Sequence, residues 1–260
     1  MSNFKHPSTT ISEKYRHLKD NLKIVEGTGN AAKICDSHLA YQAIFYIYKL
    51  LQDEQFLENN HRWSFLNENL SRQIVELWIY MLEVCEGFDT KNWNYTIEES
   101  EPMKKTNLNQ RKLSIFKYLI EITYTVTKNA EPSSFFEFNI LLFNADLIKT
   151  LLSFYKKKKF LSKSTEAYDV HIIMIAITGI IRNLSELTLN DHSQKEKWKD
   201  LEVDKTLQGF DCKYNIVYSD MTEQIITNIN QKSIKESISY LEQAGDAFER
   251  LLILVESKRF

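Results

Sequence analysis

The sequence is poor in glycine and proline. It contains 6 Gly and 3 Pro among 260 residues, whereas average shares are roughly 7 % and 5 %. These two residues form most of the turns of hairpins and the loops that hold phosphates. Neither a GxxxxGK[ST] nor a GxGxxG pattern occurs, so the sequence offers no nucleotide-binding loop. The shortage of turn-forming residues favours an all-α protein.

Cysteine is also scarce. Cys35, Cys85 and Cys212 are widely spaced and odd in number, and no CxxC or CxH cluster exists. This usage argues against a disulfide framework and against a structural zinc site. Cys35 and Cys85 lie in apolar segments of helical period, which predicts buried free thiols in a reducing compartment.

Neither sign of charge is in excess. The chain has 33 Lys+Arg and 35 Asp+Glu, a formal net charge of −2. Because binding to duplex nucleic acid relies on a basic surface, nucleic acid is not predicted as the main partner.

The longest near-continuous apolar run, residues 171–181, is shorter than the ~20 residues that span a membrane. No signal-peptide core is found near the N-terminus. We therefore expect a soluble intracellular protein, cytoplasmic or nuclear.

Apolar residues recur at spacings of three and four along most of the chain, which indicates amphipathic helices. No segment reads as a credible strand. The predicted fold class is all-α, an irregular multi-helix array or short α-solenoid of eight to nine helices. The predicted helices cover residues 11–25, 31–52, 64–86, 110–128, 135–143, 147–158, 166–189, 221–230 and 233–257.

The segments between these helices suggest one continuous helical domain. An acidic cluster and Pro102 mark the longest break, while a charged segment at 191–205 and a loop at 206–214 form another. The parts are a flexible N-terminal tail (1–10), an N-terminal helical part (11–87), a connecting loop (88–108) and a C-terminal helical part (109–260).

Two of the predicted helices are long. Residues 166–189 are apolar nearly all round and rich in β-branched side chains, but the pattern continues past Gly179 for longer than strands usually last. Residues 233–257 carry an apolar stripe and begin with Ser233 and Glu236, which are spaced as a capping box.

Residues 138–186 contain two short stretches with a family-like pattern. The segment NADLIKTLL (144–152) resembles the "hydrophobic-x-x-Leu-Leu" helix, and IAITGIIRNLS (175–185) the "Asn-Leu-Ser" inner helix, of armadillo/HEAT repeats. The family's glycine and proline positions are mostly absent, and no clear second copy follows at its period of about 40–47 residues. In that family, inner helices line a concave surface that binds peptides or proteins. The resemblance implies that Arg182 and Asn183 face such a surface.

Four consecutive lysines form the main basic patch. Lys156, Lys157, Lys158 and Lys159 lie between Tyr155 and Phe160. One interpretation is a solvated helix C-terminus, where cations complement the helix dipole. The other is a contact for an acidic partner or a phosphate. Together with Arg182 and Asn183, these lysines are the predicted partner-binding residues.

Motifs that would signal catalysis are missing. A di-metal bundle needs two Glu-x-x-His units, and the one unit present, Glu58 to His61, lies in a polar link. Zincin, nucleophile-elbow and kinase signatures do not occur. His38 and His171 are interpreted as core histidines. We predict no catalytic residue, metal ligand or cofactor.

Three function classes remain open. The first is a non-catalytic helical protein–protein interaction module or complex subunit. It is favoured because 15 Phe, 13 Tyr and 4 Trp occur on a neutral chain without motifs, and aromatic residues are enriched at interfaces as well as in cores. The second is an enzyme or small-ligand binder that uses His38, His171, Tyr168 or Asp169. The third binds RNA or single strands through residues 154–159.

Overall fold

The computed structural model describes residues 10–53, 68–88, 108–128, 147–157, 168–187, 198, 200–210 and 215–230. Within these residues the chain forms nine α-helices and one 3₁₀ turn, and no strand. The predicted all-α multi-helix array is confirmed. The elements are α1 (Ile11–Thr28), α2 (Ala31–Asp36), α3 (His38–Leu51), α5 (Glu68–Val84), the 3₁₀ turn η2 (Cys85–Gly87), α6 (Leu108–Lys128), α8 (Leu147–Phe154), α10 (Tyr168–Leu187), α12 (Val203–Gln208) and α13 (Asn215–Asn230).

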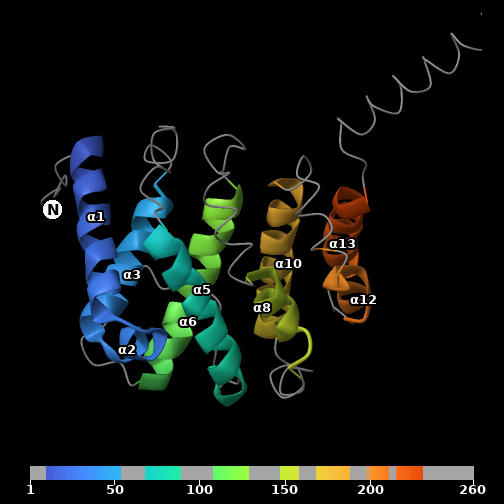
Figure 1. Cartoon of the computed structure of the whole chain (residues 1–260), viewed down its shortest axis with the longest axis horizontal. Helices are drawn as coiled ribbons and strands as arrows, with labels where there is room; N and C mark the ends of the chain where they lie inside the picture. The colour runs from blue at the N-terminus through green and yellow to red at the C-terminus, as the bar shows by residue number, and fades with distance from the viewer. Residues whose placement is uncertain are drawn as a thin grey trace, which may run out of the picture.

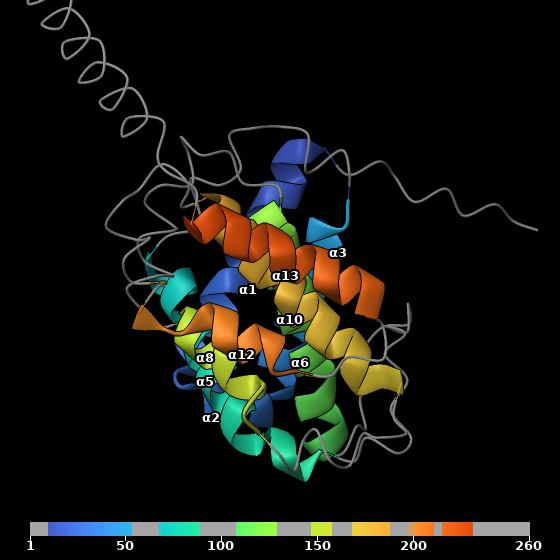
Figure 2. The same ribbon diagram turned by 90° about the vertical axis from the view of Figure 1, so that its right-hand side faces the viewer.

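The helices form two rows that run along the long axis of the molecule (Figure 1). In one row α1, α3, α6, α10 and α13 each contact the next, and in the other α2, α5, α8 and α12 do the same. The view from the α13 end looks along both rows (Figure 2). Each helix therefore buries its apolar side between its row neighbours and the opposite row.

Aromatic side chains fill the space where the rows meet. Trp78 of α5, Phe116 of α6 and Phe154 of α8 are fully buried, and their ring centroids lie 5.6–5.8 Å apart. The indole N–H of Trp78 donates to Thr123 Oγ1 at 3.0 Å, which satisfies its one polar group inside the core. This cluster joins three helices from the two rows.

Local hydrogen bonds explain where the first helices begin. Thr10 and Glu13 form a reciprocal capping box at the start of α1, and the hydrogen bond from the Thr10 backbone N–H is the main cause that lowers the pKa of Glu13. Thr10 is thus the N-cap residue of α1, which begins at Ile11, directly after the predicted tail 1–10. The second helix, α2, begins at Ala31, as predicted. Asn30 caps it, because its Oδ1 accepts from the backbone N–H of Lys33 at 3.1 Å.

Predicting a single helix over residues 31–52 was wrong. The backbone is extended at Ser37 (φ −79°, ψ 119°), where α2 ends and α3 begins. Ser37 Oγ accepts from the N–H of Ala40 at 3.2 Å and caps α3. Because buried residues continue on both sides of this break, the apolar pattern did not reveal it.

The predicted loop at residues 206–214 and the charged segment before it also need correction. Part of each is α12, and Trp198 within the charged segment is buried. In addition, α13 begins at Asn215, well before the predicted start at residue 221. The helices predicted over residues 110–128, 147–158 and 166–189 correspond to α6, α8 and α10.

Among the described helices, none has both the length and the apolar character that a membrane crossing requires.

Several predictions fall on residues outside the described ranges. The predictions outside the ranges concern the tail at 1–9, most of the loop at 88–108, the helices at 135–143 and 233–257, Glu58, His61, Lys158, Lys159 and Cys212.

Candidate functional site: the α12–α13 groove

An open groove of about 670 Å³ lies between α12 and α13, at one end of the two rows (Figure 1). We call it the α12–α13 groove. Its lining combines apolar and aromatic side chains with hydroxyl, amide and carboxylate groups: Leu207, Gln208, Phe210, Tyr218, Ser219, Thr222, Glu223, Ile226 and Thr227.

Phe210 joins the groove to a small aromatic cluster. Its ring lies 5.4 Å from the rings of both Tyr155 and Tyr218, in edge-to-face orientation, and 6.1 Å from the ring of His171. These residues come from α8 or its end, α10 and α13. Edge-to-face aromatic pairs favour defined ring orientations, so the position of Phe210 is fixed by three neighbouring elements.

Hydrogen bonds hold the wall of the groove in place. The Tyr218 hydroxyl donates to the backbone carbonyl of Leu207 at 2.7 Å, which ties α13 to α12. The hydroxyls of Tyr155 and Thr178 are 2.6 Å apart and hydrogen-bonded, which ties the end of α8 to α10. The groove is therefore preformed between fixed helices.

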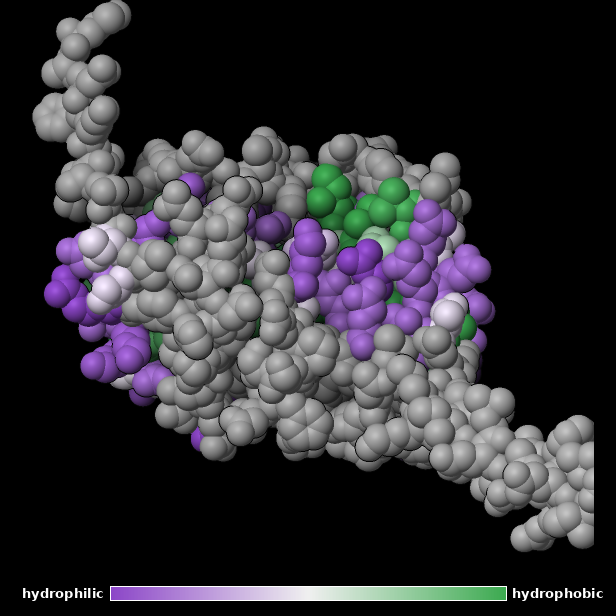
Figure 3. Space-filling model, turned by 90° about the horizontal axis from the view of Figure 1, so that it is seen from above, coloured by the Kyte–Doolittle hydropathy of each residue, from purple (hydrophilic) through white to green (hydrophobic). Residues whose placement is uncertain are grey.

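Two side chains of α13 could make further contacts, one through a hydroxyl and one through an exposed apolar group. Thr222 lines the groove and is only 7 % exposed, and its Oγ1 has no hydrogen-bond partner among the described residues. Val217 is 53 % exposed. Seen from above, hydrophobic side chains surface beside polar ones toward the end where α13 lies (Figure 3). Apolar and polar groups side by side are typical of surfaces that bind peptides and proteins.

Of the residues predicted for a ligand pocket, His38 and His171 lie on different helices. His171 is buried next to Phe210, whereas His38 lies on α3, toward the opposite end of the rows (Figure 1). Tyr168 and Asp169 are in the first turn of α10, and their side chains are outside the described set. Among the described residues, no group of three or more His, Cys, Asp or Glu side chains could hold a metal ion.

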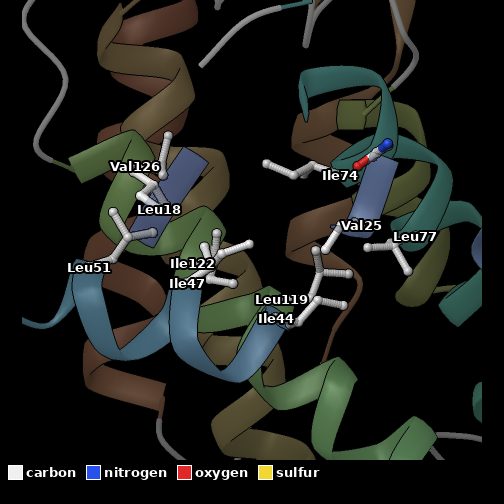
Figure 4. A pocket seen from close by; sticks show the side chains of 11 residues that line it. Leu18, Val25, Ile44, Ile47, Leu51, Ile74, Leu77, Leu119, Ile122 and Val126 are labelled. Carbon is white, nitrogen blue, oxygen red and sulfur yellow. The ribbon is translucent and has the colours of Figure 1, made fainter. Parts of the chain in front are cut away.

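A second cavity, of about 30 Å³, lies among α1, α3, α5 and α6 (Figure 4). Gln73 contributes the polar group among its described lining, and its Oε1 has no hydrogen-bond partner there. The labelled side chains are aliphatic and point toward one another: Leu18, Val25, Ile44, Ile47, Leu51, Ile74, Leu77, Leu119, Ile122 and Val126. A space of this size is a gap in packing, too small for a substrate.

Of the predicted partner-binding residues, Asn183 makes internal contacts. It is 3 % exposed, and its Nδ2 donates to Thr127 Oγ1 at 3.2 Å. Its Oδ1 accepts from Arg182 Nη2 at 3.1 Å, and Arg182 Nε lies 4.0 Å from Glu186 Oε1. Asn183 thus links α10 to α6, while Arg182 keeps part of its side chain exposed. Their role in partner binding stays a prediction.

The lysine run follows the end of α8, as one interpretation of the sequence predicted. The helix ends at Phe154, Lys156 is exposed, and Lys157 Nζ is 3.5 Å from Glu86 Oε1. Four consecutive residues of a continuing helix would point around most of its circumference. Because α8 ends at Phe154, helical geometry does not force the lysines that follow to point in different directions.

Sequence reasoning did not find the α12–α13 groove. Leu207, Phe210 and Tyr218 are apolar or aromatic, but they lie in or next to a segment that was predicted as charged or as a loop. Only the contact between α12 and α13 brings them together. No family model, curated protein or solved structure matches the chain.

Proposed function

We propose that the protein is a non-catalytic helical interaction module, or a subunit of an intracellular complex, and that it binds a protein partner through the α12–α13 groove. The observation that carries this proposal is the groove itself, whose lining combines aromatic residues with polar groups.

An amphipathic helix of the partner is the occupant that suits this geometry. Side chains of a helix fit the groove between two others when apolar residues recur every three or four positions. Phe210 is half-buried and offers rigid aromatic surface, which commonly supplies much of the energy at interfaces, whereas Tyr218 is buried and holds α13 against α12. Thr222 offers a hydroxyl that has no hydrogen-bond partner among the described residues.

The lysine run adds a second, electrostatic component to the proposal. Lys156, Lys157, Lys158 and Lys159 would attract an acidic partner through charge density, and the exposed part of Arg182 would act in the same way. The armadillo-like character of residues 138–186 would place a partner along the row of α10, and it remains part of the proposal.

The test compares two variants of α13 in the full chain. Ile226 lines the groove, whereas Gln224 is exposed and lies about 200° away around the helix. Purification at mild salt should recover a stoichiometric protein partner with wild type and with Gln224→Asp. Ile226→Asp should lose it, because an unpaired charge would then enter the apolar contact.

Two results would contradict the proposal. If wild type recovers no stoichiometric protein, the molecule is not an interaction module under these conditions. If Ile226→Asp retains the partner as well as Gln224→Asp does, binding occurs away from the α12–α13 groove. Thermal melting of both variants shows whether the fold is intact.

A further inference from the structure

The helices that form the α12–α13 groove carry mostly negative charge. Residues 200–210 and 215–230 contain one basic residue, Lys205, and five acidic ones: Asp200, Glu202, Asp204, Asp220 and Glu223. Lys205 Nζ lies 3.5 Å from Glu202 Oε1. Among the described residues, no cation pairs with Asp204, Asp220 or Glu223. Uncompensated negative charge therefore remains at this end of the two rows.

Part of this charge lies in the groove itself. Glu223 lines the groove, and Asp220 lies one helical turn before it on α13. On α12, Asp204 lies one turn before Gln208, which also lines the groove. The three carboxylates are exposed, so their combined field draws a cation toward the groove and repels an anion.

Thr222 provides evidence for a ligand that is independent of this charge. It shares one face of α13 with Ser219 and Ile226, which also line the groove. Thr222 is 7 % exposed, and its Oγ1 has no hydrogen-bond partner among the described residues. Because a buried hydroxyl without a partner lowers stability, a ligand that donates a hydrogen bond to Thr222 would satisfy this group.

The mixed lining fits a side chain with an apolar stem and a cationic head. Leu207 and the half-buried Phe210 offer apolar surface to the methylene stem of a lysine. The face of the Phe210 ring also attracts an ammonium group. Thr222 Oγ1 and the Glu223 carboxylate can accept hydrogen bonds from the three N–H groups of that ammonium. An acidic or wholly apolar side chain would leave these acceptors without a donor.

We infer that the α12–α13 groove binds a lysine side chain of the partner helix, with its ammonium group held by Thr222 Oγ1 and the Glu223 carboxylate. This assignment names the chemistry of the partner and rests on the proposed function. The groove selects a cation, whereas the lysine run selects an acidic group. A helix that places a lysine in the groove and carries acidic residues elsewhere satisfies both surfaces.

Titration with designed peptides tests the charge of the ligand directly. The probe is an amphipathic peptide of about 15 residues, long enough for a helix, with leucine at spacings of three and four and lysine elsewhere. Two matched peptides carry glutamine or glutamate in place of lysine. At about 50 mM salt, wild type should bind the lysine peptide at least about 10-fold more tightly than the glutamine peptide, and the glutamate peptide most weakly. Equal affinity for the lysine and glutamine peptides would overturn the assignment.

A substitution of Glu223 separates the groove from the general charge of the molecule. Glu223→Gln should weaken binding of the lysine peptide about 5-fold and leave that of the glutamine peptide unchanged. Glu76→Gln is the matched control, because Glu76 is exposed on α5, does not line the groove, and changes the net charge equally. An equal loss of affinity with both variants would show attraction to the whole molecule and would refute binding at Glu223.

Thr222→Val removes the hydroxyl and keeps the shape of the side chain. It should weaken binding of the lysine peptide about 10-fold, as the loss of a hydrogen bond to a charged group does. The melting temperature should stay the same or rise, because valine leaves no buried hydroxyl without a partner. Undiminished affinity would contradict the role of Thr222. A lower melting temperature would also contradict it, since the hydroxyl would then be satisfied within the fold.

The assignment and the proposed function fail in different ways. If Ile226→Asp loses the partner while Glu223→Gln and Thr222→Val recover it as well as wild type does, the groove binds a partner without a lysine in it, and the assignment is refuted. If the lysine peptide binds in a manner that depends on Glu223 and no stoichiometric protein is recovered, the cation site stands and the proposed function is refuted.

Discussion

Cys35 and Cys85 show how packing controls the chemistry of single side chains. Both thiols are buried, as their apolar sequence context predicted. Burial disfavours the thiolate and raises the pKa of Cys35 to about 12 and that of Cys85 to about 11. Since the thiolate is the reactive species, both residues are structural and chemically inert in the folded chain.

A pH-dependent loss of stability follows from the raised pKa of Cys35. The unfolded thiol ionises with its ordinary pKa of 9.0, whereas burial raises the pKa of the folded thiol to about 12. Below pH 9 the thiol is protonated in both states and does not make stability depend on pH. As the pH rises from 9 toward 12, only the unfolded chain loses the proton, so the unfolding free energy falls. Replacing Cys35 with Ala should reduce the fall in unfolding free energy by about 1 kcal/mol per pH unit between pH 9.5 and 11, somewhat below the limit of about 1.4 for one full proton.

Urea denaturation of wild type and Cys35→Ala across that window measures the difference. The comparison cancels the tyrosines and lysines that ionise in the same range. Parallel pH profiles for the two proteins would contradict a buried, protonated thiol at Cys35.

Gly179 allows a close approach between α10 and α6. A Cβ at this position would lie 2.8 Å from Cε2 of the Tyr124 ring, which is well inside contact distance. Alanine normally stabilises a helix by about 1 kcal/mol relative to glycine, but here the ring must move. We expect Gly179→Ala to lower the unfolding free energy by about 1–2 kcal/mol, as overpacked sites commonly do.

A double mutant separates the two effects. In a Tyr124→Leu background the contact with the ring is absent, and Gly179→Ala should then be neutral or stabilising because only helix propensity remains. Equal destabilisation in both backgrounds would show that the Tyr124 ring is not the cause.

At the scale of elements, the sequence predicted long helices better than their interruptions. α6 and α10 were predicted because an apolar stripe persists over their whole length. The break at Ser37 was missed because apolar residues continue across it, and a single serine cap decides the break. α12 was missed because six residues provide only Val203 and Leu207 as buried positions, too few to show a period.

The cavity among α1, α3, α5 and α6 predicts a stabilising substitution. Val126 lines this space of about 30 Å³, and the extra methylene of isoleucine would fill part of it. Val126→Ile should raise the unfolding free energy by about 0.5–1 kcal/mol, the usual gain from filling a cavity. Isoleucine also preserves the β-branched shape and so disturbs the helix little.

Val75→Ile is the matched control for this substitution. Val75 is buried on α5 but does not line the cavity among the described residues, so the same added methylene should be neutral or destabilising. Denaturant melts of both variants decide the matter. A larger gain in unfolding free energy at Val75 than at Val126 would show that the cavity does not lie beside Val126.

At the scale of the whole molecule, the two rows explain why the groove could not be read from the sequence. Each helix is specified by its own stripe, but the groove depends on where α12 and α13 meet. The polar ties between helices are equally tertiary: Asn183 contacts Thr127, and Asn228 Nδ2 donates to Ser185 Oγ at 3.0 Å. The spacing of residues within one helix does not predict such hydrogen bonds between helices.

The lysine run affects the charge of the whole molecule more than its packing. Replacing Lys156, Lys157, Lys158 and Lys159 with Gln removes four positive charges and takes the formal net charge from −2 to −6. Lys156 is exposed, and the pair between Lys157 and Glu86 is partly exposed at 3.5 Å, so it contributes little stability. The melting temperature should therefore stay nearly unchanged, since surface substitutions usually cost within ~0.5 kcal/mol each.

Binding should respond differently from stability. If the run attracts an acidic partner by charge density, the Gln variant loses most affinity at low salt, because screening already weakens the attraction of wild type at high salt. Titration of the same partner at about 20 mM and about 500 mM salt measures this difference. A loss that is equal at both salt concentrations would indicate specific hydrogen bonds instead of general attraction. Unchanged affinity at both would leave the run as a solvated helix end that complements the dipole of α8.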